Sequence, residues 1–257
     1  MCAGIGTAPG ATCGTITIAN TVTCVTATKG DGGTFYCIGA GYSGTCGTVT
    51  IGGTTGAINA KSFVYMKANS DGAGNYWSSY YNGTYAYTAD ANTTIYKGAV
   101  SGDIVQLSSV DDIPADKAAI LKSTAANISL TYTDSPSADF TGNELKGGTT
   151  VTAGYDAYTL SRGSAGTGAV GFYKFNGTSL NGNKAHLEIL SGSGARGFIG
   201  FSDGETTGIA DYKPATHDSG IANSLEQGWY DLQGHRLNGE PTQKGVYING
   251  GRKVVVK

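Results

Sequence analysis

Polar and apolar positions alternate along the first 60 residues of the chain. Thr alternates with Ile, Val or Cys over residues 14–27, and this period of two predicts half-buried β-strands separated by glycine-rich corners. The stretch CGTITI at residues 13–18 returns 33 residues later as CGTVTI at residues 46–51. A strand and corner unit of this length is typical of a β-solenoid, whose rungs bury their faces against one another. We therefore expect residues 1–60 to be the last rungs of a longer stack, with Met1 as an internal start.

The pattern changes at residue 61, where the repeat ends and short apolar runs follow, separated by turn residues. Eight such runs, none with the period of a helix, predict a β-sandwich or an open barrel over residues 61–202. The runs lie at residues 63–66, 93–97, 103–107, 118–122, 128–132, 169–175, 186–190 and 197–201. Residues 203–222 are polar and contain glycine, as linkers do, and residues 223–257 contain turn dipeptides between apolar strands, which predict a small β-hairpin tail.

The composition supports the same fold class. The chain has 42 glycines and 16 tyrosines but only 14% charged residues, which favours turns and strands over helix bundles. The expected fold is therefore all-β: the end of a β-solenoid, then a β-sandwich or open barrel, then a small C-terminal β-hairpin tail. A formal net charge of -2 argues against a nucleic-acid partner or an anionic membrane surface. No run of about 18 apolar residues occurs, so no membrane span is expected, and the first residues lack the pattern of a signal peptide.

All five cysteines lie within the first 46 residues. None of their spacings forms a CxxC pair, so a zinc site is not favoured. Cys2 and Cys37 occupy matching places in the repeat, as do Cys13 and Cys46. Because matching residues of stacked rungs lie one above the other, two arrangements are open. One is a ladder of small buried side chains, and the other is one or two disulfides between rungs, which requires an oxidising compartment.

An aromatic-rich segment at residues 75–87 is the main candidate for ligand binding. Sugar rings pack their C–H faces on aromatic rings and pair their hydroxyls with polar side chains, so this segment suits a glycan surface. Strand alternation places some of these aromatic side chains in solvent, but packing in the core of the sandwich or at a domain interface is favoured over glycan contact. The candidate glycan-binding residues are Tyr76, Trp77, Tyr80, Tyr81, Asn82 and Tyr85.

The other motifs do not favour catalysis or a cofactor. Residues 192–197 spell GxGxxG, but a strand-like FIGF follows in place of the helix that a dinucleotide site needs. Residues 69–75 resemble a calcium loop, yet Ala73 occupies a ligand position and no closing glutamate follows. His186 and Glu188 share one face of an expected strand, where a structural pair is favoured over an acid and base pair. We therefore expect no cofactor, no metal and no catalytic residue.

The C-terminal segment carries the most specific pattern. Residues 229–239 read WYDLQGHRLNG, and residues 244–257 read KGVYINGGRKVVVK. This pattern resembles the C-terminal tail of secreted and cell-surface proteins of Bacteroidetes that use the type IX secretion system, with His235 where arginine is usual. The resemblance implies a sorting signal recognised by the secretion machinery and a secreted or outer-surface location. The matching residues are Tyr230, Asp231, Leu232, Gln233, Gly234, Lys244, Gly245, Val246 and Tyr247.

The two other segments resemble parts of the same kinds of protein. The runs TIYKGAVSGDIVQLSSVDD and GFYKFNGTSLNGNKAHLEI resemble a module that precedes such tails in surface and polysaccharide-associated proteins. Residues 1–60 resemble the glycine- and threonine-rich repeats found upstream in those proteins. No catalytic residue carries over from this resemblance.

Together these patterns favour a non-catalytic secreted or cell-surface protein, the C-terminal part of a repeat adhesin or of a glycan-interacting protein. Its expected partners are a glycan or a host or cell-surface protein, and the secretion machinery. The alternative is the ancillary C-terminal region of a secreted polysaccharide-degrading enzyme whose catalytic domain is absent from this chain. A catalytic solenoid is disfavoured, because Lys29 and Asp31 are the only charged residues among residues 1–60.

Overall fold

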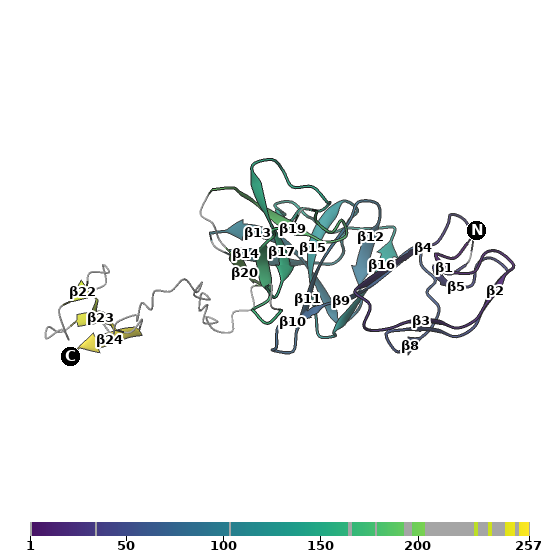
Figure 1. The fold of residues 1–257 in the computed structure, drawn as a ribbon, viewed down its shortest axis with the longest axis horizontal. Helices are drawn as coiled ribbons and strands as arrows, with labels where there is room; N and C mark the ends of the chain where they lie inside the picture. Colours follow the sequence, from purple (N-terminus) through teal and green to yellow (C-terminus); the bar gives the residue numbers. More distant parts are fainter. Residues whose placement is uncertain are drawn as a thin grey trace. The chain divides into compact units, whose positions relative to one another are not determined.

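The computed structural model describes residues 2–33, 35–102, 104–163, 166–177, 179–192 and 197–203, and the backbone of four short strands between residues 229 and 256. The chain divides into two compact units, residues 1–205 and residues 206–257, and each is described by itself. Every regular element in the described residues is a β-strand, so the predicted all-β class is confirmed (Figure 1). None of the described segments forms a helix long and apolar enough to cross a membrane.

The sequence repeat corresponds to two strand layers, here called the first rung (residues 5–18) and the second rung (residues 38–51). The rungs pair in parallel with a register of 33 residues at every pair, so that equivalent residues lie side by side. The pairs are β1 (Ile5–Gly6) with β5 (Ile38–Gly39), β2 (Thr12–Cys13) with β6 (Thr45–Cys46), and β3 (Ile16–Ile18) with β7 (Val49–Ile51), and β8 (Thr54–Thr55) adds an antiparallel strand beside β7.

Glycine is required where the two rungs approach most closely. Gly6 has a φ of +144°, and a Cβ added there would lie 1.7 Å from the carbonyl oxygen of Gly39. No side chain fits this space, so one glycine of the repeat is explained by direct backbone contact between rungs. Gly14, in the same rung, has open space around its Cβ position and no positive φ.

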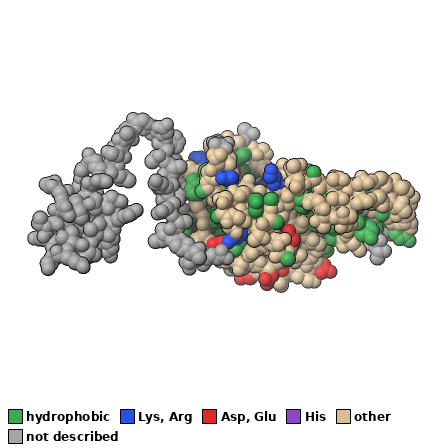
Figure 2. Space-filling view, turned by 90° about the horizontal axis from the view of Figure 1, so that it is seen from below, with side chains coloured by type: hydrophobic (Ala, Val, Ile, Leu, Met, Phe, Trp, Pro, Cys, Tyr) green, Lys and Arg blue, Asp and Glu red, His purple; other side chains and the backbone are tan. Residues whose placement is uncertain are grey.

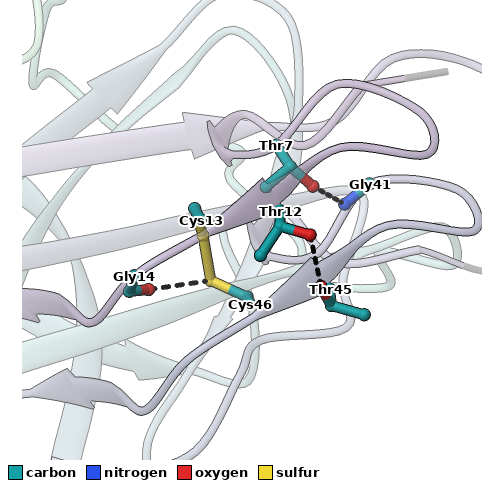
Figure 3. The surroundings of a disulfide bond; sticks show 7 residues. All are labelled: Thr7, Thr12, Cys13, Gly14, Gly41, Thr45 and Cys46. Atoms are coloured by element: carbon teal, nitrogen blue, oxygen red, sulfur yellow. Dashed lines mark hydrogen bonds between the residues drawn. A yellow bond between two sulfur atoms is a disulfide. The ribbon is translucent and has the colours of Figure 1, made fainter.

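A disulfide joins the rungs in the next strand pair (Figure 3). Cys13 and Cys46 are bonded through their sulfur atoms, and their Cα atoms lie 4.8 Å apart. The hydroxyls of Thr12 and Thr45, one residue earlier in each rung, are hydrogen-bonded at 2.9 Å. The pairing follows from the register, because a parallel in-register ladder places identical residues directly opposite each other.

A four-stranded sheet connects the rungs to the rest of the unit. Its order is β12 (Ala86–Ala89), β16 (Asn127–Thr133), β9 (Ser62–Lys67) and β4 (Cys24–Thr28). β4 lies between the two rungs in sequence, yet it pairs antiparallel with β9 along its whole length. The segment expected to end at residue 60 and the segment expected to start at residue 61 therefore share one sheet within one compact unit.

The second sheet has nine strands and curls strongly. Its order is β10 (Asn69–Ser70), β11 (Tyr76–Asn82), β15 (Lys117–Ser123), β13 (Thr93–Ser101), β14 (Ile104–Val110), β20 (Phe198–Ser202), β18 (Gly171–Lys174), β17 (Tyr155–Ser161) and β19 (His186–Leu190). All eight apolar runs singled out in the sequence fall on strands of these two sheets. β17 was not predicted, because its residues mix tyrosine with polar side chains and lack a clean apolar run.

Three hydrophobic cores lie along the first unit: a repeat core against the rungs, a middle core between the two sheets, and an inner core inside the curl of the nine-stranded sheet. The main members of the repeat core are Ile18, Ile38, Val49, Ile51, Phe63 and Tyr65. Those of the middle core are Val64, Met66, Tyr80, Tyr87, Leu121 and Leu130. Those of the inner core are Trp77, Val105, Ile120, Tyr158, Phe172 and Leu187.

Two central strands are buried on both faces. Ala119 and Leu121 of β15 belong to the middle core, whereas Ala118 and Ile120 belong to the inner core. β9 is divided in the same way between the repeat core and the middle core. Two-sided burial explains why both strands read as continuous apolar runs and not as alternating ones.

We predict that Gly6→Ala lowers the free energy of unfolding by about 1–3 kcal/mol, because the new methyl group collides with the second rung. The matched control Gly14→Ala, where the space is open, should change it by no more than about 0.5 kcal/mol. Urea unfolding followed by far-ultraviolet circular dichroism measures both. Equal effects at the two positions would contradict the close approach of the rungs.

We also predict that the unreduced chain, unfolded in guanidinium, contains three reactive thiols, those of Cys2, Cys24 and Cys37. Prior reduction should raise the count to five, because it opens the Cys13–Cys46 bond. The double variant Cys13→Ser/Cys46→Ser should lose about 2–4 kcal/mol of stability, since the bond closes a long loop. Five thiols without reduction would contradict the assigned pairing.

Candidate functional site

The structure places the centre of the predicted aromatic surface inside the protein. Trp77 is 5% exposed in the inner core, with its ring centroid 4.5 Å from that of Phe201. Tyr80 is 1% exposed in the middle core, where its ring meets that of Tyr87 edge to face. These two side chains are therefore core residues and do not form a glycan surface, because the strand that carries them is covered on both faces.

The remaining aromatic candidates are partly exposed but have structural partners. Tyr81 donates a hydrogen bond from its hydroxyl to Asp116 at 2.6 Å, and Gly147 lies against its ring. Tyr85 meets Tyr132 edge to face, and Tyr76 packs against the middle core. A polar pocket of about 270 Å³ adjoins Tyr81 and is lined by Asp116, Lys117 and Lys146 among others.

Asn82 closes a turn. Its Oδ1 atom accepts hydrogen bonds from the backbone N–H groups of Thr84 and Tyr85, at 2.8 and 2.9 Å. This is the arrangement in which an asparagine side chain stabilises the loop that follows it. The candidate glycan-binding residues thus separate into two core residues, three partly exposed tyrosines with structural partners, and one turn residue.

The loop at residues 69–75, for which the sequence does not favour a calcium site, is organised in a similar way. The carboxylate of Asp71 accepts hydrogen bonds from the backbone of Ala73 and Asn75, from the Asn75 side chain, and from the Trp77 indole. These bonds outweigh the effect of partial burial, so the pKa of Asp71 is lowered. In the part of the chain that the structure describes, no group of three His, Cys, Asp or Glu side chains could hold a metal ion.

The two matched cysteine pairs of the repeat differ in the structure. Cys13 and Cys46 are bonded, whereas Cys2 is exposed with a free thiol and Cys37 is buried with a free thiol in the repeat core. The register of 33 residues places Gly4, and not Cys2, beside Cys37, since Ile5 pairs with Ile38. The match of Cys2 with Cys37 in the sequence comes from a local similarity that is offset from the structural register.

The C-terminal unit contains a small sheet in the order β22 (Arg236–Leu237), β21 (Trp229–Tyr230), β23 (Gly245–Asn249) and β24 (Arg252–Val256). Tyr230 lies on β21, and Gly245, Val246 and Tyr247 lie on β23. The other residues of the predicted sorting signal lie outside the described residues; these are Asp231, Leu232, Gln233, Gly234 and Lys244. Most of the predicted linker lies outside the described residues as well.

The features of the described surface that bear on ligand binding are the distribution of its charges and its pockets. On the face shown in Figure 2, the Lys and Arg side chains of the described residues are scattered and do not gather into one patch. A pocket of about 320 Å³ lies where the two ends of the curled sheet meet. We call this meeting place the seam; it consists of residues 78–81 of β11 and the facing residues 183–186.

Hydrogen bonds hold the seam together without completing a strand ladder. The backbone N–H of Tyr81 donates to the carbonyl of Asn183, and the hydroxyl of Ser79 donates to the carbonyl of Ala185, both at 3.2 Å. Leu160, Phe175 and Leu180 supply an apolar side of the pocket, whereas its amide and hydroxyl groups come from Thr23, Asn69, Ser79, Thr159 and Asn181. The seam pocket therefore has an apolar wall and convergent polar groups, which is the usual make-up of a small-molecule site.

Lys184 is the most unusual side chain of the seam pocket. Its ammonium donates a hydrogen bond to Ser78 at 2.8 Å and lies 4.0 Å from the sulfur of Met66. None of the ion pairs found among the described residues includes Lys184. Desolvation lowers the pKa of Lys184, and the Cys24 side chain, when ionised, would oppose this only in part.

His186 is the second unusual side chain of the seam pocket. Its side chain is 1% exposed, and neither ring nitrogen has a hydrogen-bond partner among the described residues. Its Nε2 atom lies 3.6 Å from Oε1 of Glu188, which shares its face of β19. Burial lowers the pKa of His186, although Glu188 acts in the opposite direction, and the neutral imidazole is favoured.

Glu188 is held away from the pocket. Its carboxylate accepts hydrogen bonds from the backbone N–H and the hydroxyl of Thr152, at 2.8 and 2.6 Å. Partial burial raises the pKa of Glu188, but these bonds outweigh it and the pKa is lowered overall. The carboxylate is therefore ionised and already bonded, and it does not line the pocket.

The seam pocket contains a lysine and a serine in hydrogen-bond contact, Lys184 and Ser78. In a serine and lysine catalytic pair, the amine must accept the serine proton. Here Lys184 donates to Ser78, and the Ser78 hydroxyl in turn donates to the sulfur of Met66 at 3.4 Å. No Asp or Glu stands among the described residues that line the pocket, so the paired carboxylates of glycoside hydrolysis are not supplied there.

Comparison of the chain with protein-family models, with curated proteins and with solved structures finds no match. The resemblance of the tail, the middle segment and the repeats to bacterial surface proteins therefore stays a prediction.

We predict that stability falls between pH 7 and pH 5 partly because of His186. Its folded pKa is below the ordinary value of 6.5, so the unfolded chain binds a proton in this range before the folded chain does. Stability is then retained above about pH 6.5 and lost below it. The variant His186→Gln, which cannot titrate, should show a smaller loss in urea unfolding at the two pH values. An unchanged pH dependence would contradict a buried neutral imidazole.

Proposed function

We propose that this chain is a non-catalytic binding module of a secreted or cell-surface protein, and that it binds one saccharide unit of a glycan in the seam pocket. The observation that carries the proposal is the pocket itself, which combines an apolar wall with amide, hydroxyl and ammonium groups. Its volume of about 320 Å³ is at the small end of ligand sites, as expected for a single ring and not for an extended chain.

The lining supports a polyhydroxylated ligand. A sugar ring has an apolar C–H face that can pack on Phe175, the aromatic residue of the pocket wall. Its hydroxyls both donate and accept, which suits the amides of Asn69 and Asn181 and the hydroxyl of Thr159. A purely apolar ligand would leave these groups unpaired, at a cost of about 1–3 kcal/mol for each buried group.

The proposed location rests on the disulfide and on the tail. The Cys13–Cys46 bond favours an oxidising compartment such as the cell exterior. The C-terminal resemblance to sorting tails adds the secretion machinery as a partner, and the paired rungs suit the end of a repeat adhesin. A binding module without catalysis also fits the alternative parent, a polysaccharide-degrading enzyme with its catalytic domain elsewhere.

We predict that the purified chain binds glycans on an array and that Phe175→Ala weakens the binding by about tenfold, through loss of ring packing. The matched control is Tyr155→Ala, which removes an exposed aromatic ring outside the pocket and should leave affinity unchanged. Titration of the best array ligand by isothermal calorimetry gives the values. Trp77→Ala is unsuitable here, because it would open a cavity in the inner core.

Two results would contradict the proposal. One is the absence of binding to any glycan by the folded chain. The other is binding that Phe175→Ala and Tyr155→Ala reduce equally, which would place the ligand outside the seam pocket.

A further inference from the structure

The charge of the seam pocket is one-sided. Lys67, Lys184 and His186 line it, whereas no carboxylate does so among the described residues. We propose that the pocket selects a saccharide unit that bears a carboxylate, such as a uronic acid, and that the Lys184 ammonium is its contact. This inference rests on the proposed function and goes further by naming the class of sugar.

Lys184 is an ammonium group kept largely out of water without an opposite charge. Its partners are a hydroxyl on β11 and a thioether on β9, and both are neutral. Burying an ionised group is costly unless a counter-charge accompanies it. A ligand carboxylate would supply that counter-charge, and a hydrogen bond between two charged groups is about twice as strong as a neutral one.

None of the described groups around Lys184 acts as the counter-charge of its ammonium. On β4 the neighbouring titratable group is the Cys24 thiol, whose pKa is raised by burial, so it is neutral at pH 7. Glu188 on β19 is bonded to Thr152 and does not line the pocket. Lys67 at the end of β9 adds a second positive charge. The described surroundings therefore contain no built-in anion for Lys184.

His186 adds a second basic side chain, besides the lysines, to the lining of the pocket. It is fully buried, lines the pocket, and has two ring nitrogens without a hydrogen-bond partner among the described residues. A buried polar group is normally paired with protein, water or ligand. The Nε2 atom of His186 lies 3.6 Å from the Glu188 carboxylate, which does not line the pocket.

The test uses pairs of ligands that differ only in charge. Trigalacturonic acid and triglucuronic acid are each compared with their methyl esters, which keep the ring but lose the negative charge. The full chain is titrated with each ligand by isothermal calorimetry at pH 7. We expect at least one acid to bind about tenfold or more tightly than its own ester.

Two lysine variants assign the preference. Lys184→Met keeps the length and apolar stem of the side chain but removes its charge, and should bring the acid down to the affinity of its ester. Lys117→Met removes the same charge from an exposed position of β15 outside the seam pocket, and should leave the preference intact. Thermal unfolding of both variants checks that they fold, and the comparison of acid with ester in the unaltered chain does not depend on them.

The outcomes separate this inference from the proposed function. Equal binding of acids and esters would overturn the carboxylate preference while leaving a saccharide pocket in place. A preference that survives Lys184→Met would overturn the role of Lys184. No binding of any saccharide would overturn the proposed function and this inference together.

Discussion

The described unit depends on strands that are buried on both faces. β9 separates the repeat core from the middle core, and β15 separates the middle core from the inner core. Each of these strands therefore contributes apolar burial, worth about 25 cal/mol per Å², to two cores at once. The three cores are coupled, because a shift of either strand disturbs the packing on both of its sides. The rungs are part of this arrangement through β4, which extends the sheet that β9 belongs to.

The seam pocket is a consequence of the same packing. The inner core fills the curl of the nine-stranded sheet and brings its two ends close, yet β11 and the segment before β19 make only scattered hydrogen bonds there. Polar groups at such an incomplete junction lack the partners that a continuous ladder would give them. Lys184 and His186 are the clearest examples, since one lacks a counter-charge and the other lacks any hydrogen-bond partner among the described residues. The function proposed here follows from that shortage.

The sequence predicted the strands well because short apolar runs bounded by turns are a local signal. The 33-residue period likewise appears directly as the parallel register of the rungs. Core packing of Trp77 and Tyr80 was the favoured interpretation, and both are buried. Alternation could not assign them to a face, since it distinguishes a buried face from an exposed one only when one face is exposed. The pocket could not be predicted either. Ser78 and Lys184 are 106 residues apart in the chain, and only the curl of the sheet brings them together.

The most direct test of the account is the titration of Lys184 itself, followed through the carbon-13 shift of its ε-carbon by NMR, with Lys184→Met to assign the signal. In the free chain, Lys184 should titrate at a lower pH than the exposed lysines, because it is desolvated without a counter-charge. Saturation with a uronic acid oligosaccharide should move its pKa upward, as a bound carboxylate stabilises the ammonium. A Lys184 that titrates with the exposed lysines and does not respond to the acidic sugar would contradict the central claim.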